Sequence, residues 1–398
     1  MFSSTSTRVQ NSHQRRNKLF GVLLTSIFLA SISSFLPTPA LGQTNRQTLG
    51  RQLLQTFIRC VEKKIPNPNI ANETQLQNAA TDCIAKEILL DSNGKLRPDA
   101  NDRVAALIEV SGAKLPQRIA KGKANITLSY LAENQIYTIP VSIGNTNKTF
   151  LLDTGSGQTI VNSQLARQLG LKSVAVPPGL LQQKPVIGGN LSQVPASVFT
   201  LPTLSVSAAS VTNLYVLGLP SASIPDNLAG VLGLDFLSHF DLIINPQNRQ
   251  LQLLPPSQPV SGAIPLRGNF GILTAQVYIN NQGPFNFIVD TGATSMIISK
   301  DLAQKLRIDL NMAEREEILG FGGTENAKKI TLAKIQLQQH QATKLEAYIL
   351  ENSPILTLPG IQGIIGQNFL NQYRQHWRFG KRNSLGLIES GTLVLTPL

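Results

Sequence analysis

The chain has few of the residue types that hold metals, and it lacks the sequence pattern that is typical of a nucleic-acid surface. Two cysteines and four histidines occur in 398 residues, none with metal-ligand spacing, so we expect no metal site and no cofactor. Charged residues make up 15%, and no run of Lys and Arg alternates with aromatic residues, so we expect no nucleic-acid partner despite a net charge of +12. A hydrophobic content of 42% is typical of an ordered globular protein. Ordinary surface or core roles are expected for His13, His239, His340 and His376.

Long apolar runs are absent beyond the N-terminal region. The single run there, Leu19–Leu36, follows basic residues and precedes small ones, a pattern typical of an export signal over residues 1–42. A retained signal-anchor helix is the alternative, because the run is close to the lower length limit for spanning a bilayer. We expect cleavage, no stable membrane span afterwards, and a periplasmic, cell-envelope or secreted protein. The residues that carry this pattern are Arg15, Arg16, Lys18, Pro37, Pro39, Ala40 and Gly42.

Both cysteines, Cys60 and Cys83, lie in a region of helical periodicity. In an exported protein we expect them to form one disulfide that joins two helices. The surrounding residues 43–125 are predicted to form a small helical domain, which is a pro-segment, a substrate adaptor or a stabilising cap. Its apolar residues at helical spacing are Leu49, Leu53, Phe57, Val61, Ala80, Ile84, Ile88, Val104, Leu107 and Ile108.

One short pattern occurs twice in the rest of the chain. Phe150–Gly157 is an apolar run, read as a buried strand, that ends in Asp-Thr-Gly, and Phe287–Thr294 repeats it 137 residues later. A duplicated unit with one carboxylate per turn predicts a two-carboxylate site on a pseudo-twofold axis. Two such carboxylates share a proton, so one acts as acid and the other as base. The identical pairs are Phe150/Phe287, Asp153/Asp290, Thr154/Thr291, Gly155/Gly292, Ile160/Ile297, Leu165/Leu302, Ala166/Ala303 and Leu169/Leu306.

β-like sequence surrounds each carboxylate in the same order. A predicted hairpin precedes each turn, and a β-like run and a short helix follow it, at Ser163–Leu169 and Lys300–Leu306. About 30 residues after each carboxylate comes a glycine-rich segment, which is either a plain tight turn or the tip of a mobile flap. Its similar position in both copies favours the flap. The predicted flap residues are Ile187, Gly188, Gly189, Gly320, Phe321, Gly322 and Gly323.

Each copy closes with an apolar element framed by glycines, Ala229–Leu237 and Gln362–Leu370, which suits close packing beneath a catalytic turn. We predict final strands at Trp377–Phe379 and Ser384–Ile388, and an exposed linker at Lys121–Lys123. The predicted organisation is a signal peptide (1–42), a helical domain (43–125), lobe 1 (126–256), a linker (257–263) and lobe 2 (264–398).

These motifs resemble the aspartic-peptidase superfamily. The Asp-Thr-Gly-Ser/Ala turn, the glycine-rich flap and the closing apolar element occur in that order twice, over about residues 128–395. Each lobe is more similar to a retropepsin (retroviral-type) unit than to a pepsin lobe. The resemblance implies a mainly β fold of two retropepsin-like β-barrel lobes in a pseudo-twofold bilobal arrangement, preceded by a small α-helical domain. Retropepsins usually pair two identical chains, whereas this chain carries two unequal lobes.

The resemblance also implies site residues and an activity. Asp153 and Asp290 would activate one water for attack on a peptide bond, and Thr154 and Thr291 would hydrogen-bond across the lobe interface. We expect an exported aspartic endopeptidase that acts on peptides or proteins as a monomer with an intramolecular pseudo-dimer. An inactive module that grips peptide, and lobes that each pair with another chain, are the alternatives. The remaining turn residues would be Gly155, Ser156, Gly292 and Ala293.

Overall fold

The structure, a computed structural model, describes residues 43–66, 71–94, 97, 99–111, 117–131, 136–176, 191, 194–258, 260–269, 271–310, 313–320, 323–351, 353–358, 360–383 and 386–398. Contacts divide the chain into two units: Met1–Pro116 with Ser173–Lys184, and Gln117–Lys172 with Pro185–Leu398. The predicted signal segment lies outside the described residues. Within the part that is described, no helix is long and apolar enough to cross a membrane.

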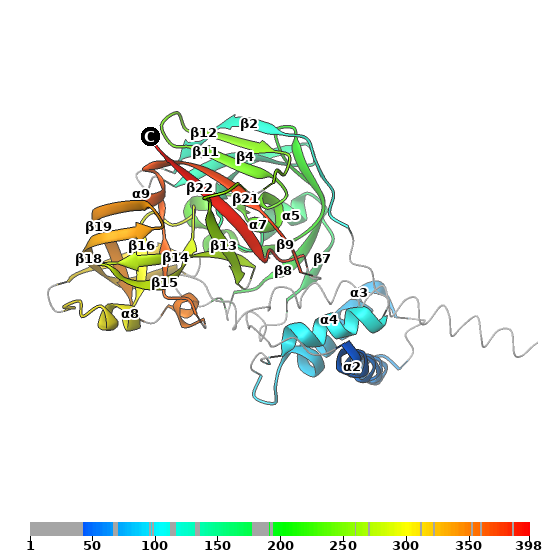
Figure 1. The fold of residues 1–398 in the computed structure, drawn as a ribbon. Coiled ribbons are helices and arrows are strands. Elements are labelled where there is room, and N and C mark those ends of the chain that lie inside the picture. Colours follow the sequence, from blue (N-terminus) through cyan, green and yellow to red (C-terminus); the bar gives the residue numbers. More distant parts are fainter. Residues whose placement is uncertain are drawn as a thin grey trace, which may run out of the picture. The chain divides into compact units, whose positions relative to one another are not determined.

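The first unit is helical, as its sequence periodicity predicts (Figure 1). Asn72 and Gln75 form a reciprocal capping box that starts its second helix. The predicted disulfide is present, with the Cα atoms of Cys60 and Cys83 5.8 Å apart. The elements of this unit are α2 (Gln43–Lys64), α3 (Glu73–Cys83), the π-helical turn η1 (Ile84–Leu89), α4 (Ala100–Ser111) and β7 (Ser173–Ala175).

Lobe 1 is a closed six-stranded barrel. Its strands pair in the order β9-β6-β10-β5-β4-β8, and β8 pairs with β9 to close the ring. Closure leaves no free edge among these strands. The bounds are β4 (Tyr137–Ile143), β5 (Thr146–Leu152), β6 (Ile160–Asn162), β8 (Ser197–Val206), β9 (Ala209–Leu219) and β10 (Gly230–Leu232), with helix α5 at Ser163–Gln168.

Lobe 2 repeats this barrel strand by strand. The order is β18-β19-β16-β20-β15-β14, and β14 pairs with β18 to close the ring. The register repeats too, because Gly230 pairs with Phe150 in lobe 1 and Gly363 pairs with Phe287 in lobe 2, both between parallel strands. The bounds are β14 (Ile272–Ile279), β15 (Gln282–Val289), β16 (Met296–Ser299), β17 (Glu314–Gly320), β18 (Gly323–Leu337), β19 (His340–Leu350) and β20 (Gly363–Ile365), with helix α8 at Lys300–Lys305.

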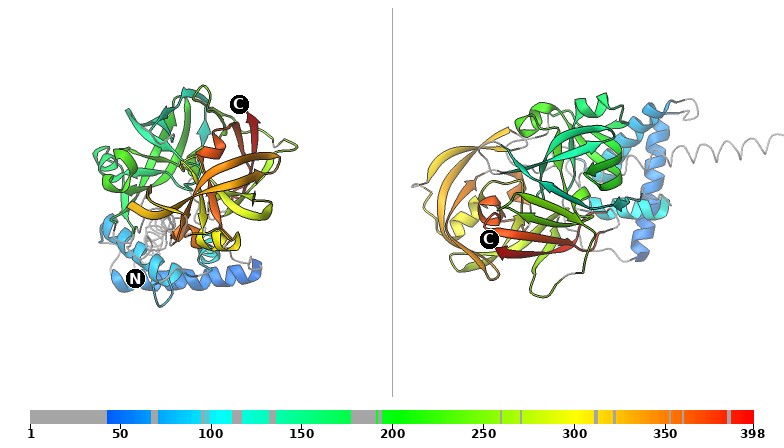
Figure 2. Two further views of the ribbon diagram at one scale, coloured as in Figure 1. Left: turned by 90° about the vertical axis from the view of Figure 1, so that its left-hand side faces the viewer. Right: turned by 90° about the horizontal axis from the view of Figure 1, so that it is seen from above.

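A six-stranded sheet of strands from both halves joins the barrels (Figures 1 and 2). Its order is β13-β22-β21-β11-β12-β2, and the two halves meet where Leu242 of β11 pairs with Trp377 of β21. The mainly β fold with two barrel lobes, predicted from the sequence, is therefore confirmed. The bounds are β2 (Ala124–Thr127), β11 (Asp241–Asn245), β12 (Gln250–Leu254), β13 (Ile264–Asn269), β21 (Tyr373–Phe379) and β22 (Ser390–Pro397).

Two sequence predictions about connecting segments are corrected in part. Of the predicted strand Ser384–Ile388, Ser384 and Leu385 lie outside the described residues; the chain turns at Gly386, whose φ is +77° and whose N–H donates to the carbonyl O of Asn383, and the last strand begins at Ser390. The predicted linker at Lys121–Lys123 begins in a strand, because β1 (Ala120–Lys121) pairs with β9. The remaining short elements are β3 (Ser129–Tyr130), η3 (Ser221–Ser223), η4 (Pro225–Asn227) and η5 (Pro354–Thr357).

The disulfide gives a prediction for the helical unit. The disulfide links two residues that are 23 positions apart in the sequence. Replacing Cys60 and Cys83 together by Ala removes this cross-link and raises the conformational entropy of the unfolded chain, so we expect the helical unit to lose about 3 kcal/mol of stability. Far-UV circular dichroism during urea denaturation of the full chain measures this loss of stability. Wild-type protein with its disulfide reduced should show the same loss. An unchanged transition for the helical signal would contradict it.

Candidate active site

Asp153 and Asp290 stand at equivalent positions, one residue beyond β5 and β15 respectively. Both β strands are apolar and buried at their ends, so each carboxyl is placed where the strand leaves the barrel. The Asp153 N–H donates to the carbonyl O of Leu232 at 3.2 Å, and that of Asp290 donates to Ile365 at 3.0 Å. Each turn is thus fixed to the end of the neighbouring strand, β10 or β20.

Reciprocal hydrogen bonds between two buried threonines join the turns. The Thr154 Oγ1 donates to the carbonyl O of Val289 at 2.9 Å and accepts the N–H of Thr291 at 3.1 Å. The Thr291 Oγ1 does the same in return, donating to Leu152 at 3.0 Å and accepting the N–H of Thr154 at 3.0 Å. Both side chains are fully buried, so these bonds form away from water and hold the turns in one relative position. The expected bonds across the lobe interface are present.

Each carboxyl lies over the glycine of the opposite turn. A Cβ added at Gly155 would lie 2.4 Å from Cγ of Asp290, and one at Gly292 would lie 2.7 Å from Cγ of Asp153. Real Cβ atoms do not approach that closely, so only glycine fits at either position. The Gly155 N–H also donates to Oδ1 of Asp290 at 3.2 Å. The structure therefore brings together the two carboxyls that the repeat predicts.

The two carboxyls are buried: Asp153 is 6% exposed and Asp290 is 8% exposed. Each influences the pKa of the other. Burial raises the pKa of Asp153 well above its usual value, and the negative charge of Asp290 raises it further, against the N–H groups of Gly155 and Ser156. Burial also raises the pKa of Asp290, but the hydrogen bond from Asp153 and the N–H groups of Gly292 and Gly155 oppose this. The pair therefore holds one proton. Its negative charge is better stabilised on Asp290, whose Oδ1 accepts the N–H groups of Gly155 and Gly292, whereas Oδ1 of Asp153 accepts the N–H of Ser156.

Side chains of the short helices α7 (Leu234–Leu237) and α9 (Gln367–Leu370) form hydrogen bonds with the segments that contain the two turns. In lobe 1, Asp235 accepts the N–H of Thr159 at 2.9 Å; in lobe 2, Asn368 accepts the N–H of Met296 at 3.1 Å. Gln367, fully buried, donates its Nε2 to the carbonyl O of Thr291 at 3.0 Å. Sequence reasoning gave these three residues no role, although a polar residue inside each closing apolar element was a usable signal.

Two of the other predicted turn residues differ between the lobes. The Ser156 N–H donates to Oδ1 of Asp153 at 2.9 Å, and its hydroxyl donates to the carbonyl O of Gln158 at 2.7 Å. Ala293, at the matching position of lobe 2, accepts the N–H of Gln367 through its carbonyl at 2.8 Å. The lobe 1 turn therefore has one internal hydrogen bond, from the Ser156 hydroxyl, that alanine cannot form.

The predicted flap of lobe 2 is a hairpin. Strands β17 and β18 pair from Glu314 with Lys329 to Gly320 with Gly323. Phe321 and Gly322, between these last two, lie outside the described residues, as do Ile187, Gly188 and Gly189 of lobe 1.

A second apolar cluster, separate from the main core, lies next to the Asp290 turn. It contains Ala293 of the turn, Ile297 of β16 and Ala327 of the hairpin strand β18, with Ile318 of β17 packed against it. The hairpin base therefore packs over apolar side chains beside the carboxyl pair. The other buried members are Ile272, Ile288, Leu350, Ile361 and Ile364. Among the described residues, no group of three or more His, Cys, Asp or Glu could hold a metal ion.

Two family models match the lobes. Residues 139–236 match the family described as "Aspartyl protease", and residues 275–372 match that described as "gag-polyprotein putative aspartyl protease". No curated protein matches the chain. A crystal structure of a retropepsin-like aspartic protease from Rickettsia conorii matches at 22% identity and a TM-score of 0.25, over 34% of this chain and 94% of that chain.

The threonine bonds give a stability prediction. Thr154→Val keeps the side-chain shape but leaves the buried N–H of Thr291 and the carbonyl of Val289 without a partner, which we expect to cost about 2–4 kcal/mol. Thr154→Ser keeps the hydroxyl and loses one methyl, for about 1 kcal/mol or less. Urea denaturation of the full chain measures both. Equal losses in the two variants would contradict a role for the hydroxyl.

The carboxyl pair gives a prediction on pH and stability. Because the pKa of Asp153 is raised, the folded state binds more protons than the unfolded chain from its usual value of 3.8 up to the raised pKa. The stability of the wild type should therefore fall, relative to Asp153→Asn, as the pH rises from 4 to 8. Urea denaturation at each pH measures the difference, with Asp301→Asn, at an exposed position of α8, as the control. A difference that stays constant with pH would contradict the shared proton.

Proposed function

We propose that this chain, whose two lobes are retropepsin-like aspartic peptidase domains, is an exported aspartic endopeptidase with both catalytic carboxyls in one polypeptide. One observation carries the proposal: Asp153 and Asp290 are buried, each against the glycine of the opposite turn, and the threonine bonds hold the two turns together. This arrangement places one neutral and one ionised carboxyl next to each other.

The two protonation states divide the work of peptide hydrolysis. The Asp290 carboxylate takes a proton from a water as the water oxygen attacks the amide carbon. The neutral Asp153 carboxyl donates its proton to the carbonyl oxygen, which gives a neutral tetrahedral intermediate with two hydroxyls. Return of a proton from this intermediate to the carboxylate now on Asp153, and donation of the Asp290 proton to the amide nitrogen, break the C–N bond. The pair ends with one proton, as it began.

The apolar cluster beside the Asp290 turn suggests a substrate class. An extended peptide that pairs with the β17–β18 hairpin would place alternate side chains toward the barrel. There it would meet Ala293, Ile297 and Ile318, none of which is polar. We propose that the enzyme prefers apolar side chains next to the cleaved bond.

Export and a single-chain mode of action are also proposed. The N-terminal apolar segment with its basic flank supports export, and so does the Cys60–Cys83 disulfide, because disulfides persist in oxidising compartments. The pairing of β11 with β21 supports a monomer, because each lobe finds its sheet partner within the same chain.

Digestion of a mixed peptide library between pH 3 and pH 8 tests the proposal. We expect the full chain to cut, at a rate proportional to its concentration, and apolar residues to be enriched beside the cut. Asp153→Asn and Asp290→Asn should each lower the rate by about 100- to 10,000-fold, since each removes one half of the acid–base pair. Asp301→Asn, at an exposed position of α8, should keep the wild-type rate.

Two outcomes would overturn it. Wild-type protein that binds library peptides but cuts none at any pH would indicate an inactive peptide-binding module. A rate that rises with the square of the chain concentration would indicate that lobes of different chains pair to form the site.

A further inference from the structure

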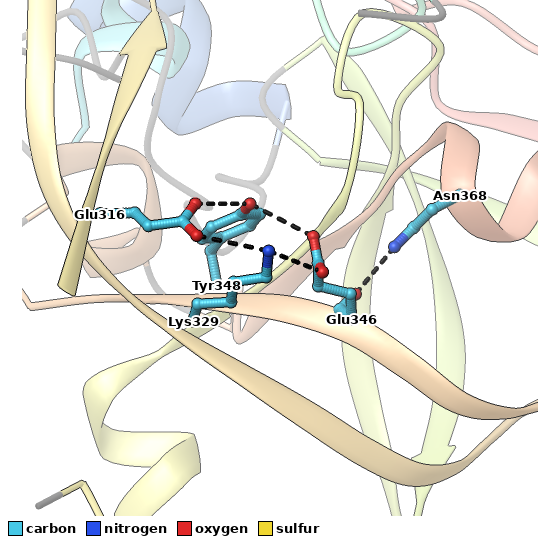
Figure 3. Close-up of polar contacts among 5 residues, drawn as sticks. All are labelled: Glu316, Lys329, Glu346, Tyr348 and Asn368. Atoms are coloured by element: carbon cyan, nitrogen blue, oxygen red, sulfur yellow. Dashed lines mark hydrogen bonds and ion pairs between the residues drawn. The ribbon is translucent and has the colours of Figure 1, made fainter. Parts of the chain in front are cut away.

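Four polar side chains cluster at the base of the β17–β18 hairpin, outside the carboxyl pair. Figure 3 shows Lys329 between two glutamates and beside the hydroxyl of Tyr348. The Lys329 Nζ lies 3.3 Å from Oε1 of Glu316 and 2.8 Å from Oε2 of Glu346. The Tyr348 hydroxyl lies 2.9 Å from Oε2 of Glu316 and 3.3 Å from Oε1 of Glu346. These four residues, the flap-base network, connect β17 and β18 of the hairpin to β19 of the barrel.

Each member has at least two partners in the network. Such a shared arrangement restrains the side chains more than an isolated surface pair would, although about a third of each of Lys329 and Glu316 remains exposed. The two glutamates raise the pKa of the Lys329 ammonium, so it stays charged. Burial and the two glutamates raise the pKa of Tyr348 to about 12, so its hydroxyl keeps the proton that it donates.

The strand that receives the hairpin is itself tied to the catalytic turn. The Asn368 Nδ2 donates to the carbonyl O of Glu346 at 2.7 Å, as Figure 3 also shows. The same Asn368 accepts the N–H of Met296 at 3.1 Å and donates its N–H to the carbonyl O of Thr294 at 2.9 Å. The ring of Tyr348 packs against the apolar cluster that contains Ala293. The hairpin base therefore has a defined position relative to the Asp290 turn.

Lobe 1 is built differently at the matching positions. Ile160 pairs with Leu217, and its counterpart Ile297 pairs with Tyr348, so Leu217 corresponds to Tyr348. Asp235, which corresponds to Asn368, has no amide N–H₂ to donate to the neighbouring strand. The lobe 1 residues that correspond to Lys329, Glu346 and Tyr348 carry no ammonium or carboxylate: they are Val198, Tyr215 and Leu217.

We propose that the flap-base network is a positioning device that holds the base of the lobe 2 hairpin beside the Asp290 turn and so sets how tightly peptide is bound. Its members do not touch the reacting atoms. The inference rests on the proposed function where it concerns peptide binding, but the anchoring itself does not depend on activity.

Hydrogen–deuterium exchange of the full chain tests the anchoring. Lys329→Met removes both ion pairs, and Tyr348→Phe removes the hydroxyl but keeps the ring on the apolar cluster. In both variants we expect backbone N–H groups of Glu314–Gly320 to exchange about tenfold faster than in the wild type. Lys334→Met is the matched control, because Lys334 lies on the same strand and contacts Asn281 outside the network. It should leave exchange in Glu314–Gly320 unchanged.

Salt and a conservative variant separate the ion pairs from general packing. Raising the ionic strength from 0.01 M to 1 M shortens the screening length from about 30 Å to about 3 Å, so it should speed exchange in the wild type and not in Lys329→Met. Glu316→Gln keeps an acceptor for the Tyr348 hydroxyl but loses the charge that faces Lys329, so its exchange rate should be intermediate. Unchanged exchange in Lys329→Met and Tyr348→Phe would overturn the anchoring.

Steady-state kinetics on a library peptide that the enzyme cleaves test the role of the network in peptide binding. Both variants should raise KM by about three- to tenfold and change kcat less than twofold, because the carboxyl pair is untouched. Faster exchange with an unchanged KM would overturn the role in peptide binding. If the wild type cuts nothing, the proposed function fails, and the exchange experiment still decides whether the network anchors the hairpin.

Discussion

The site depends on one constraint, the reciprocal hydrogen bonding of Thr154 and Thr291 at the point where the two halves meet. Each hydroxyl satisfies a backbone group of the opposite turn, so neither turn is complete without the other. The position of the carboxyls follows, since each lies against the opposite glycine at a distance no side chain would permit. Shared protonation is then a consequence of geometry, because two buried carboxyls this close cannot both ionise freely.

The two halves have the same fold but different local chemistry. Both barrels close with the same strand order and the same register at Gly230 and Gly363. The residues that hydrogen-bond to the chain just after each turn differ: Asp235 accepts the N–H of Thr159 in lobe 1, and Asn368 accepts the N–H of Met296 in lobe 2. An amide both donates and accepts, whereas an ionised carboxylate only accepts, so lobe 2 has a link from turn to barrel strand that an ionised Asp235 cannot make. Duplication followed by divergence at a few polar positions accounts for a chain with two similar lobes and unequal carboxyl surroundings.

The sequence was most informative where a local pattern specifies local structure. The repeated Asp153 and Asp290 turns and the helices α5 and α8 follow from apolar runs, a turn and a capping residue, all within a few residues. Long-range pairing was not readable in this way: β1 on β9 and the last strand at Ser390 depend on partners far along the chain. Likewise Lys329, Glu316 and Tyr348 look like ordinary exposed strand residues until the hairpin brings them together. Residues 1–42 and the lobe 1 flap lie outside the described residues.

The joint sheet between the barrels has a consequence for how the halves are related. Strand β11 of the first half and β21 of the second are inner strands only because they pair with each other. Cut at the segment between the lobes, each half would carry a three-stranded remnant with an unsatisfied row of backbone donors and acceptors. We therefore expect the two pieces to reassociate, because reassociation would rebuild this sheet and bring the threonines back together in the same step.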